Sequence, residues 1–394
     1  MNFLAAVIFA IAVQGFFLCY LLINTNKGVA QRVLAALVLA MSIAILGPAM
    51  GLAGYYVLLP HFIRVGDPLV FVFGPLLFIY ICCLTRGQLP KKWLLHFLPF
   101  LLYVLYLLPF YAMSGDDKIA YVERLFADKT MNTETMVVQF VRTVHVTIYM
   151  LASLQLVVAF QKQIKDNFSN IEKVTLATVS RLLKLFLAVA VVGTCTFIAS
   201  FFTSINIVFI NGLISLTVGI VIYGVAYATW SRPAVVLPEQ VETMTDTPLP
   251  PELPAKPAEP EEIQEVLQEE KERTKHHIRD EDYPQLVTKL EELVKEGLHL
   301  DNDLTLLQLA YRLHIQPYQA SELINRYYKG SFFDFINSKR IQEVQKRLKD
   351  PELAHFSVLG IAMDCGFNSK SSFNTAFKKF TGLTPTQFRE TTPA

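Results

Sequence analysis

Long apolar runs fill the first 232 residues of the chain, and polar and charged positions prevail in the remainder. Seven runs are long enough to be helices that cross a bilayer, because a hydrocarbon core of about 30 Å takes about 20 apolar residues. Five of the seven hold no charged residue, the fourth holds only His96, and the fifth holds Arg142 and His145. The predicted spans are residues 3–23, 33–57, 69–85, 93–113, 136–160, 185–203 and 205–229.

The polar part of the chain begins with a stretch that has the composition of a linker. Residues 233–260 contain eight prolines and no aromatic residue, so they cannot bury a core and are expected to be disordered and extended. From residue 261 the chain is acidic and favours a short helix, either solvated or forming a brief coiled-coil seam between two protomers. The pattern therefore predicts a membrane domain at 1–232, a Pro/Glu-rich linker at 233–282 and a soluble domain at 283–394.

Basic residues in the loops predict which side of the membrane each part occupies. Loops 24–32, 86–92 and 161–184 together hold ten Lys and Arg residues, whereas loops 58–68 and 114–135 hold four. Loops rich in Lys and Arg stay in the cytoplasm. With seven spans, the N-terminus is therefore expected outside and the soluble domain inside.

Ionisable residues in the fifth run are the candidate chemistry of the membrane half. Gln139 and Arg142 are three residues apart and His145 follows one turn later, so the three are neighbours on one side of a helix. Ionisable side chains in hydrocarbon are costly and often mark a site, so these residues are a candidate site for a membrane signal. The alternative is an arginine that extends to the outer interface.

The sequence holds little that indicates catalysis. The spans lack the strings of carboxylates that a proton-coupled transporter uses, and the five cysteines have no zinc-binding spacing. No Ser/His/Asp or Cys/His constellation stands in a plausible place. We therefore predict neither an enzyme nor a cofactor or metal site.

Residues 283–394 have the periodicity of an all-helical domain. A helix that starts near Pro284 and ends at Gly297 precedes a helix–turn–helix pair over 304–328. A long helix follows over 332–348, and a second pair follows over 358–380. We expect the apolar positions of the long helix at Phe333, Ile336, Ile341, Val344 and Leu348.

The second pair has specific local signals. Gly366 suits a left-handed turn, and Ser369 can cap the helix that follows. That helix is expected to bury Phe373, Ala376, Phe377 and Phe380 and to expose Lys370, Ser371, Asn374, Thr375 and Lys378. Small polar and basic residues at the start of such a helix can reach base edges in a major groove.

These residues carry a resemblance to a known family. Residues 361–389, IAMDCGFNSKSSFNTAFKKFTGLTPTQFR, resemble the signature of AraC/XylS-type transcriptional regulators, and residues 309–348 are similar to the first unit and linking helix of that family. The runs GPLLFIYI (74–81) and HFLPFLLY (96–103) are more weakly similar to the seven-span sensor half of a subgroup of these regulators found in Bacteroidetes-like bacteria.

The resemblance implies two recognition helices that enter successive major grooves on one face of DNA. The first unit departs from the family pattern, since His314 stands in place of the usual turn glycine, Gln316 in place of the capping serine and Ala320 in place of a packed leucine. We therefore expect the second unit to carry most of the sequence discrimination. The second helix would offer Lys370, Ser371, Ser372, Asn374, Thr375 and the phosphate-contacting Lys378, and the first would offer Tyr318, Ser321 and Glu322.

Glu322 is an acidic residue at a position that would face DNA. It would either accept a hydrogen bond from a cytosine amino group or weaken the attraction to phosphate. Residues 301–394 hold twelve Lys and Arg against nine Asp and Glu, which is modest for a DNA-binding domain. Binding as a homodimer to a repeated site would raise the affinity for DNA.

The expected protein is all-α. A seven-helix bundle lies in a bacterial inner membrane, a disordered linker follows, and a tandem helix-turn-helix domain lies in the cytoplasm. The expected function is that of a one-component transcription regulator. Its partners would be double-stranded DNA, the lipid bilayer and an unknown signal ligand or membrane partner. The alternative is a transporter or sensor whose helical C-terminal domain binds a protein partner instead of DNA.

Overall fold

The computed structural model describes residues 2–25, 28–127, 133–171, 177–202, 207–231, 277–353 and 355–391. In these ranges every regular element is a helix, and one isolated bridge joins Phe168 to Thr305. The all-helical class is therefore confirmed. The chain divides into two compact units, the first made of residues 1–160 and 176–235 and the second of residues 161–175 and 236–394. Most of the predicted linker, including its short helix, lies outside the described residues.

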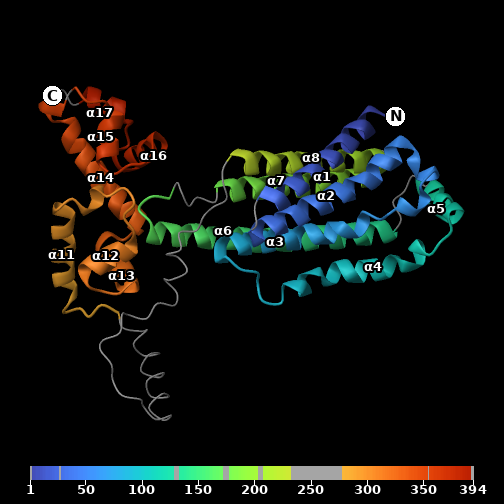
Figure 1. Ribbon diagram of the computed structural model, residues 1–394, viewed down its shortest axis with the longest axis horizontal. Helices are drawn as coiled ribbons and strands as arrows, with labels where there is room; N and C mark the ends of the chain where they lie inside the picture. Colours follow the sequence, from blue (N-terminus) through green and yellow to red (C-terminus); the bar gives the residue numbers. More distant parts are fainter. Residues whose placement is uncertain are drawn as a thin grey trace, which may run out of the picture. The chain divides into compact units, whose positions relative to one another are not determined.

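Seven helices of the first unit occupy the seven predicted apolar runs (Figure 1). Helix α2 contacts α1, α3 and α8, and α7 contacts α8. Helix α6 is longer at both ends than the apolar run that predicted it. The bounds are α1 Phe3–Thr25, α2 Val29–Ala53, α3 Val70–Arg86, α4 Leu98–Tyr111, α6 Thr133–Asn167, α7 Ala177–Phe202 and α8 Ile207–Ser231.

The outer surface of this unit is apolar. Among the described residues, five helical stretches are long and apolar enough to cross a membrane, and α7 and α8 contain the shorter apolar stretches Leu183–Cys195 and Asn211–Val225. Phe140 and Ile148 on α6 are 64% and 59% exposed, respectively. Helices that are apolar on their outer as well as their inner faces are typical of a lipid environment.

Short elements connect these helices. Three 3-10 turns, Tyr55–Val57, Pro60–Phe62 and Asp67–Leu69, join α2 to α3, and a fourth, Trp93–Phe97, leads into α4. Helix α5, Gly115–Ala127, lies in what the sequence predicted only as a loop, and it packs on the second of these turns.

The second unit contains two hydrophobic cores that share helix α14. The first core is built from α11, α12, α13 and the start of α14, and the second from the end of α14 with α15, α16 and α17. The long helix covers the residues predicted for it. The bounds are α11 Tyr283–Lys295, α12 Leu306–Leu313, α13 Pro317–Tyr328, α14 Phe332–Leu348, α15 Val358–Asp364, α16 Lys370–Thr381 and α17 Pro385–Thr391.

Two core residues of α14, Phe332 and Phe335, are missing from the apolar positions predicted for this helix. Phe332 and Phe335 are buried in the first core, and Phe333 is only half-buried. The reason is that α14 faces two cores in turn, so a single apolar stripe does not describe it. Ile341 and Val344 were among the predicted apolar positions, and both are buried in the second core.

The residues that follow α6 pack in the second unit, although the sequence predicted a plain loop there. Phe168 is buried and forms its bridge with Thr305. The Ser169 N–H donates to the carbonyl of Leu304 at 3.2 Å, and its hydroxyl donates to the same oxygen at 2.6 Å. Two residues far from the helical domain in sequence therefore belong to its fold.

Arg340 on α14 is the buried cation beside this contact. It is 1% exposed, and it donates to the carbonyls of His299 at 2.8 Å and Asp301 at 2.6 Å and to the Ser169 hydroxyl at 3.2 Å. Burial lowers the pKa of Arg340 to about 10, so the side chain is still charged at neutral pH. A buried charge persists only where hydrogen bonds replace its water, and these acceptors replace it here.

Candidate functional site

The turn between α15 and α16 is built around a glycine. Gly366 has a φ of +91°, and a Cβ atom placed there would lie 2.8 Å from the carbonyl oxygen of Leu300. Any other residue would be strained and would also collide with backbone. Ser369 then caps α16, because its hydroxyl accepts from the Ser372 N–H at 3.2 Å. Both local predictions for this turn are confirmed.

Helix α16 has one buried and one exposed face. Phe373 and Phe377 are 1% and 0% exposed and stack edge to face in the second core. Ser372 is half-buried, and its hydroxyl donates to the Ser369 carbonyl. This hydroxyl is therefore less available for an outside partner than the exposed groups of the helix. The exposed side chains include those of the five residues predicted to be exposed, Lys370, Ser371, Asn374, Thr375 and Lys378, and also that of Lys379.

The middle of this face is a shallow, open depression. Asn374, Thr375, Lys378 and Lys379 line it. Lys379 forms an ion pair with Asp334 on α14 at 2.6 Å, which fixes one wall of the depression to the long helix. The result is a firmly supported surface with hydrogen-bonding and basic groups.

The first helix-turn-helix unit also has a capped first helix, a tight turn and a packed second helix, but other residues supply them. Thr305 and Gln308 form a capping box at the start of α12. His314 takes the turn position with a φ of +57°, and Ala320 is fully buried at the packed position of α13. Tyr318 on α13 is 45% exposed and Ser321 is half-buried, so both reach the surface of the unit.

Glu322 has intramolecular partners that the sequence did not indicate. One of its oxygens accepts from the Ile278 N–H at 3.2 Å and lies 3.3 Å from the His277 ring nitrogen. Its other oxygen lies 3.7 Å from Arg326, which in turn pairs with Asp280 at 2.7 Å. Glu322 thus attaches the segment before α11 to α13, and its carboxylate is committed to the fold.

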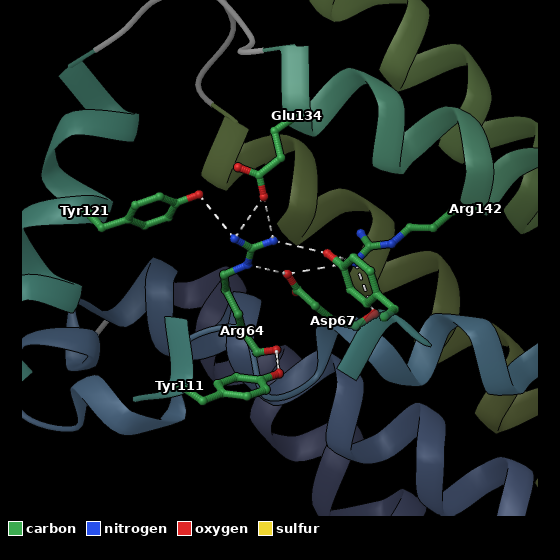
Figure 2. Close-up of polar contacts among 7 residues, drawn as sticks. Arg64, Asp67, Tyr111, Tyr121, Glu134 and Arg142 are labelled. Atoms are coloured by element: carbon green, nitrogen blue, oxygen red, sulfur yellow. Dashed lines mark hydrogen bonds and ion pairs between the residues drawn. The ribbon is translucent and has the colours of Figure 1, made fainter. Parts of the chain in front are cut away.

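A charged cluster lies in the first unit (Figure 2). The guanidinium of Arg64 contacts Asp67 at 3.2 Å and Glu134 at 3.3 Å, and it also donates to the hydroxyls of Tyr103 and Tyr121. Arg142 on α6 lies 3.8 Å from the same Asp67 carboxylate. Helix α6 therefore brings Glu134 and Arg142 to residues from the turns before α3.

The three predicted membrane-site residues lie in two environments. Gln139 and Arg142 line a cavity inside the unit. His145 does not line it and packs between the rings of Phe71, at 5.3 Å, and Tyr149, at 4.9 Å. Both ring nitrogens of His145 are buried without a hydrogen-bond partner. The structure thus brings only two of the three together.

Sequence reasoning missed Arg64, Asp67, Glu134 and Tyr103. Arg64 entered only the count of Lys and Arg residues in loop 58–68, and Asp67, Glu134 and Tyr103 were given no role. A usable signal was an Arg and an Asp three residues apart immediately before an apolar run. No group of three or more His, Cys, Asp or Glu side chains that could hold a metal ion occurs in the part of the chain that the structure describes.

The C-terminal domain is similar to known proteins. A family model described as a helix-turn-helix domain matches residues 309–391, which makes this part an AraC-type helix-turn-helix domain. The melibiose operon regulatory protein of Escherichia coli is 30% identical over 90 residues, which are 23% of this chain and 29% of that protein. The regulatory protein PocR of Salmonella typhimurium is 28% identical over 92 residues, again 23% and 29% of the two chains.

A third relative is shorter. The probable transcription factor PqrA of Proteus vulgaris is 35% identical over 57 residues, 14% of this chain and 44% of that protein. The chain thus covers less than half of the length of each of these relatives. No solved structure matches it.

Proposed function

We propose that the protein is a membrane-embedded, one-component transcription regulator that binds double-stranded DNA through its two helix-turn-helix units. The observation that carries the proposal is the exposed face of α16. A cap, a turn glycine and a closed aromatic core hold Lys370, Ser371, Asn374, Thr375 and Lys378 outward. Two of the relatives are named as regulatory proteins, which supports a role in transcription regulation and favours a regulator over an enzyme.

The proposal assigns unequal roles to the two units. Asn374 is exposed and has the amide that can pair bidentately with adenine, whereas Lys378 offers a point charge suited to phosphate. In the first unit Tyr318 and Ser321 are accessible, and Glu322 holds the fold together. The first unit would therefore position the domain more than it specifies sequence.

The membrane half supplies anchoring and signal reception in this proposal. The excess of Lys and Arg in loops 24–32, 86–92 and 161–184 supports an outside N-terminus and a cytoplasmic DNA-binding domain. Gln139 and Arg142 would belong to the site that receives the signal, with His145 as a packed neighbour. A homodimer on a repeated site would compensate for the modest net charge of the domain.

The test is binding of DNA by the full chain in lipid nanodiscs, with a preferred sequence first selected from a random duplex library. Asn374→Ala is expected to relax selection at one base pair, by about 1–3 kcal/mol for a bidentate contact. Lys378→Ala is expected to weaken binding to all sequences alike and to lower the salt slope by about one unit.

The matched control is Lys295→Ala, a lysine-to-alanine change at an exposed position on α11 away from the proposed face. It is expected to leave both selection and salt slope unchanged. If the full chain shows no salt-dependent DNA binding, the proposal fails, and the alternative of a protein-binding helical domain takes its place.

A further inference from the structure

The membrane unit contains a partly open cavity of about 440 Å³. Its walls come from α2, α3, α6, α7 and α8 together with the turns before α3, and α4 and α5 add Tyr103, Tyr121 and Val122. This volume falls in the range of about 300–1,000 Å³ in which proteins bind small molecules. The lining is mostly apolar, and the ionisable side chains gather at one end, where Arg64, Asp67, Glu134 and Arg142 meet (Figure 2).

The two arginines at the charged end differ in how far their donors are used. Arg64 donates from all three of its nitrogens to Asp67, Glu134 and tyrosine hydroxyls. Arg142 donates from one terminal nitrogen to the carbonyl of Asp67 and to Tyr103, and its Nε is buried without a hydrogen-bond partner. An unpaired buried N–H costs free energy that an acceptor recovers. Arg142 therefore has unused capacity for an acceptor.

A further buried cation, Lys118, lies near Arg64 but does not line the cavity. Lys118 is 2% exposed, and its ammonium contacts the His61 ring at 3.0 Å and the Tyr111 carbonyl at 2.9 Å, neither of which is a carboxylate. Lys118 and Arg64 both lie against the ring of Phe110, at 5.8 and 5.3 Å. The lining itself holds two cations, Arg64 and Arg142, and two carboxylates, Asp67 and Glu134. Both carboxylates contact Arg64 at 3.2 and 3.3 Å, whereas Arg142 lies 3.8 Å from Asp67, so an anionic acceptor would pair with Arg142.

The body of the cavity suits hydrocarbon. Gly193 on α7 has no atom within 4 Å of the position that a Cβ would take, and it borders the cavity, so open space lies beside it. The apolar lining comes mainly from aliphatic and aromatic side chains that face one another across the bundle. They include Ile45, Leu77, Val138, Val146, Phe186 and Val218.

We propose that this cavity binds an amphipathic monoanion, with an oxyanion head on Arg142 and a hydrocarbon body among the apolar side chains. The inference rests on the proposed function, because it names the chemical class of the signal that the membrane half would receive. The unpaired Nε of the Arg142 guanidinium selects and places the anionic head, and the apolar lining places the body.

The experiment uses the full chain in nanodiscs of phosphatidylcholine and measures equilibrium binding of radiolabelled dodecanoate. Unlabelled dodecanoate is expected to compete, whereas dodecanol and dodecyltrimethylammonium, which share the chain and lack the anion, are expected to compete at least ten-fold less well. Equal competition by all three probes would mean that the head is not recognised and would overturn the proposal. Absence of saturable binding would overturn it as well.

Two variants locate the site. Arg142→Gln is expected to weaken dodecanoate binding about 10- to 100-fold through loss of a charged hydrogen bond, and Arg124→Gln, on the exposed part of α5, is its matched control. Gly193→Leu fills the open space and is expected to reduce binding of dodecanoate more than of hexanoate. Val191→Leu, 53% exposed on the same helix, controls for it.

Gly193→Leu keeps the proposal testable even if Arg142→Gln does not fold. Unchanged binding in a folded Gly193→Leu variant would place dodecanoate elsewhere and overturn the proposal. Adding phosphatidylglycerol to the nanodiscs separates the sources of the anion, since competition by this lipid would identify a bilayer headgroup as the natural occupant. DNA binding is measured on the same samples, so a wild-type protein that binds DNA but shows no saturable binding of dodecanoate refutes this inference and leaves the proposed function intact.

Discussion

At the scale of single residues, Glu322 shows that an exposed-looking acid on a recognition helix can be structural. Its oxygens contact Ile278, His277 and Arg326, and its side chain is only 20% exposed. We expect Glu322→Ala to lower the unfolding free energy of fragment 277–394 by about 1 kcal/mol, because a charged hydrogen bond is lost at a partly solvated position.

Chemical denaturation followed by circular dichroism measures this effect. Glu390→Ala, an exposed glutamate on α17, is the control and is expected to leave the unfolding free energy unchanged. An equal free energy for wild type and Glu322→Ala would show that the contacts with the segment before α11 contribute nothing.

His299 makes the stability of the same domain depend on pH. Burial lowers the pKa of its imidazole below the ordinary 6.5, an effect that Glu343 opposes and Arg340 and Lys339 reinforce. The unfolded chain therefore takes up this proton more readily than the folded one. Stability is complete above about pH 6.5 and falls as the pH drops below that value.

We expect the unfolding free energy of fragment 277–394 to fall between pH 7 and pH 5, and His299→Gln to reduce that fall. Glutamine keeps an amide donor without gaining a charge in this pH range. Denaturant melts at several pH values measure both curves. Parallel curves for the two proteins would assign the pH dependence to other groups.

At the scale of elements, the bridge after α6 adds residues from before the linker to the helical domain. Phe168 and Thr305 face each other in antiparallel fashion. Such opposed residues have Cα atoms roughly 4.5–5.5 Å apart, which suits a disulfide. We expect the double substitution Phe168→Cys and Thr305→Cys to give a linked peptide on mild oxidation of the full chain, detected by mass spectrometry.

Each single substitution is the control for this crosslink and is expected to give no peptide that joins positions 168 and 305. If the double variant also gives none, the bridge is not a stable feature of the second unit. Arg340 would then have to satisfy its donors without Ser169.

At the scale of the whole molecule, the membrane topology is the feature with the widest consequences. We expect a reporter enzyme that is active only after export to be silent when fused after Trp230 and active when fused within loop 114–135. The reason is the excess of Lys and Arg in the alternate loops. Expression of both fusions is checked by immunoblot, and the reverse pattern would contradict DNA binding by the C-terminal domain.

The sequence alone determined the helical class, the positions of the seven apolar helices and most of the second helix-turn-helix unit. These features depend on local rules. Apolar period and length set the helices, and α14 begins and ends at the predicted residues. Gly366 and Ser369 act through their own backbone conformation and hydrogen bonds, so a short stretch of sequence suffices to identify them.

Which distant polar side chains meet depends on how the helices pack. Arg64 joins Tyr103 and Glu134, which lie 39 and 70 residues further along the chain, and Arg340 joins Ser169 across 171 residues. The hydrophobic periodicity of a helix indicates whether a residue faces a core, but it does not identify the residue that it contacts in another helix. Buried charges need partners wherever the fold can supply them, so these clusters follow from packing, and the roles of Arg142 and Glu322 follow with them.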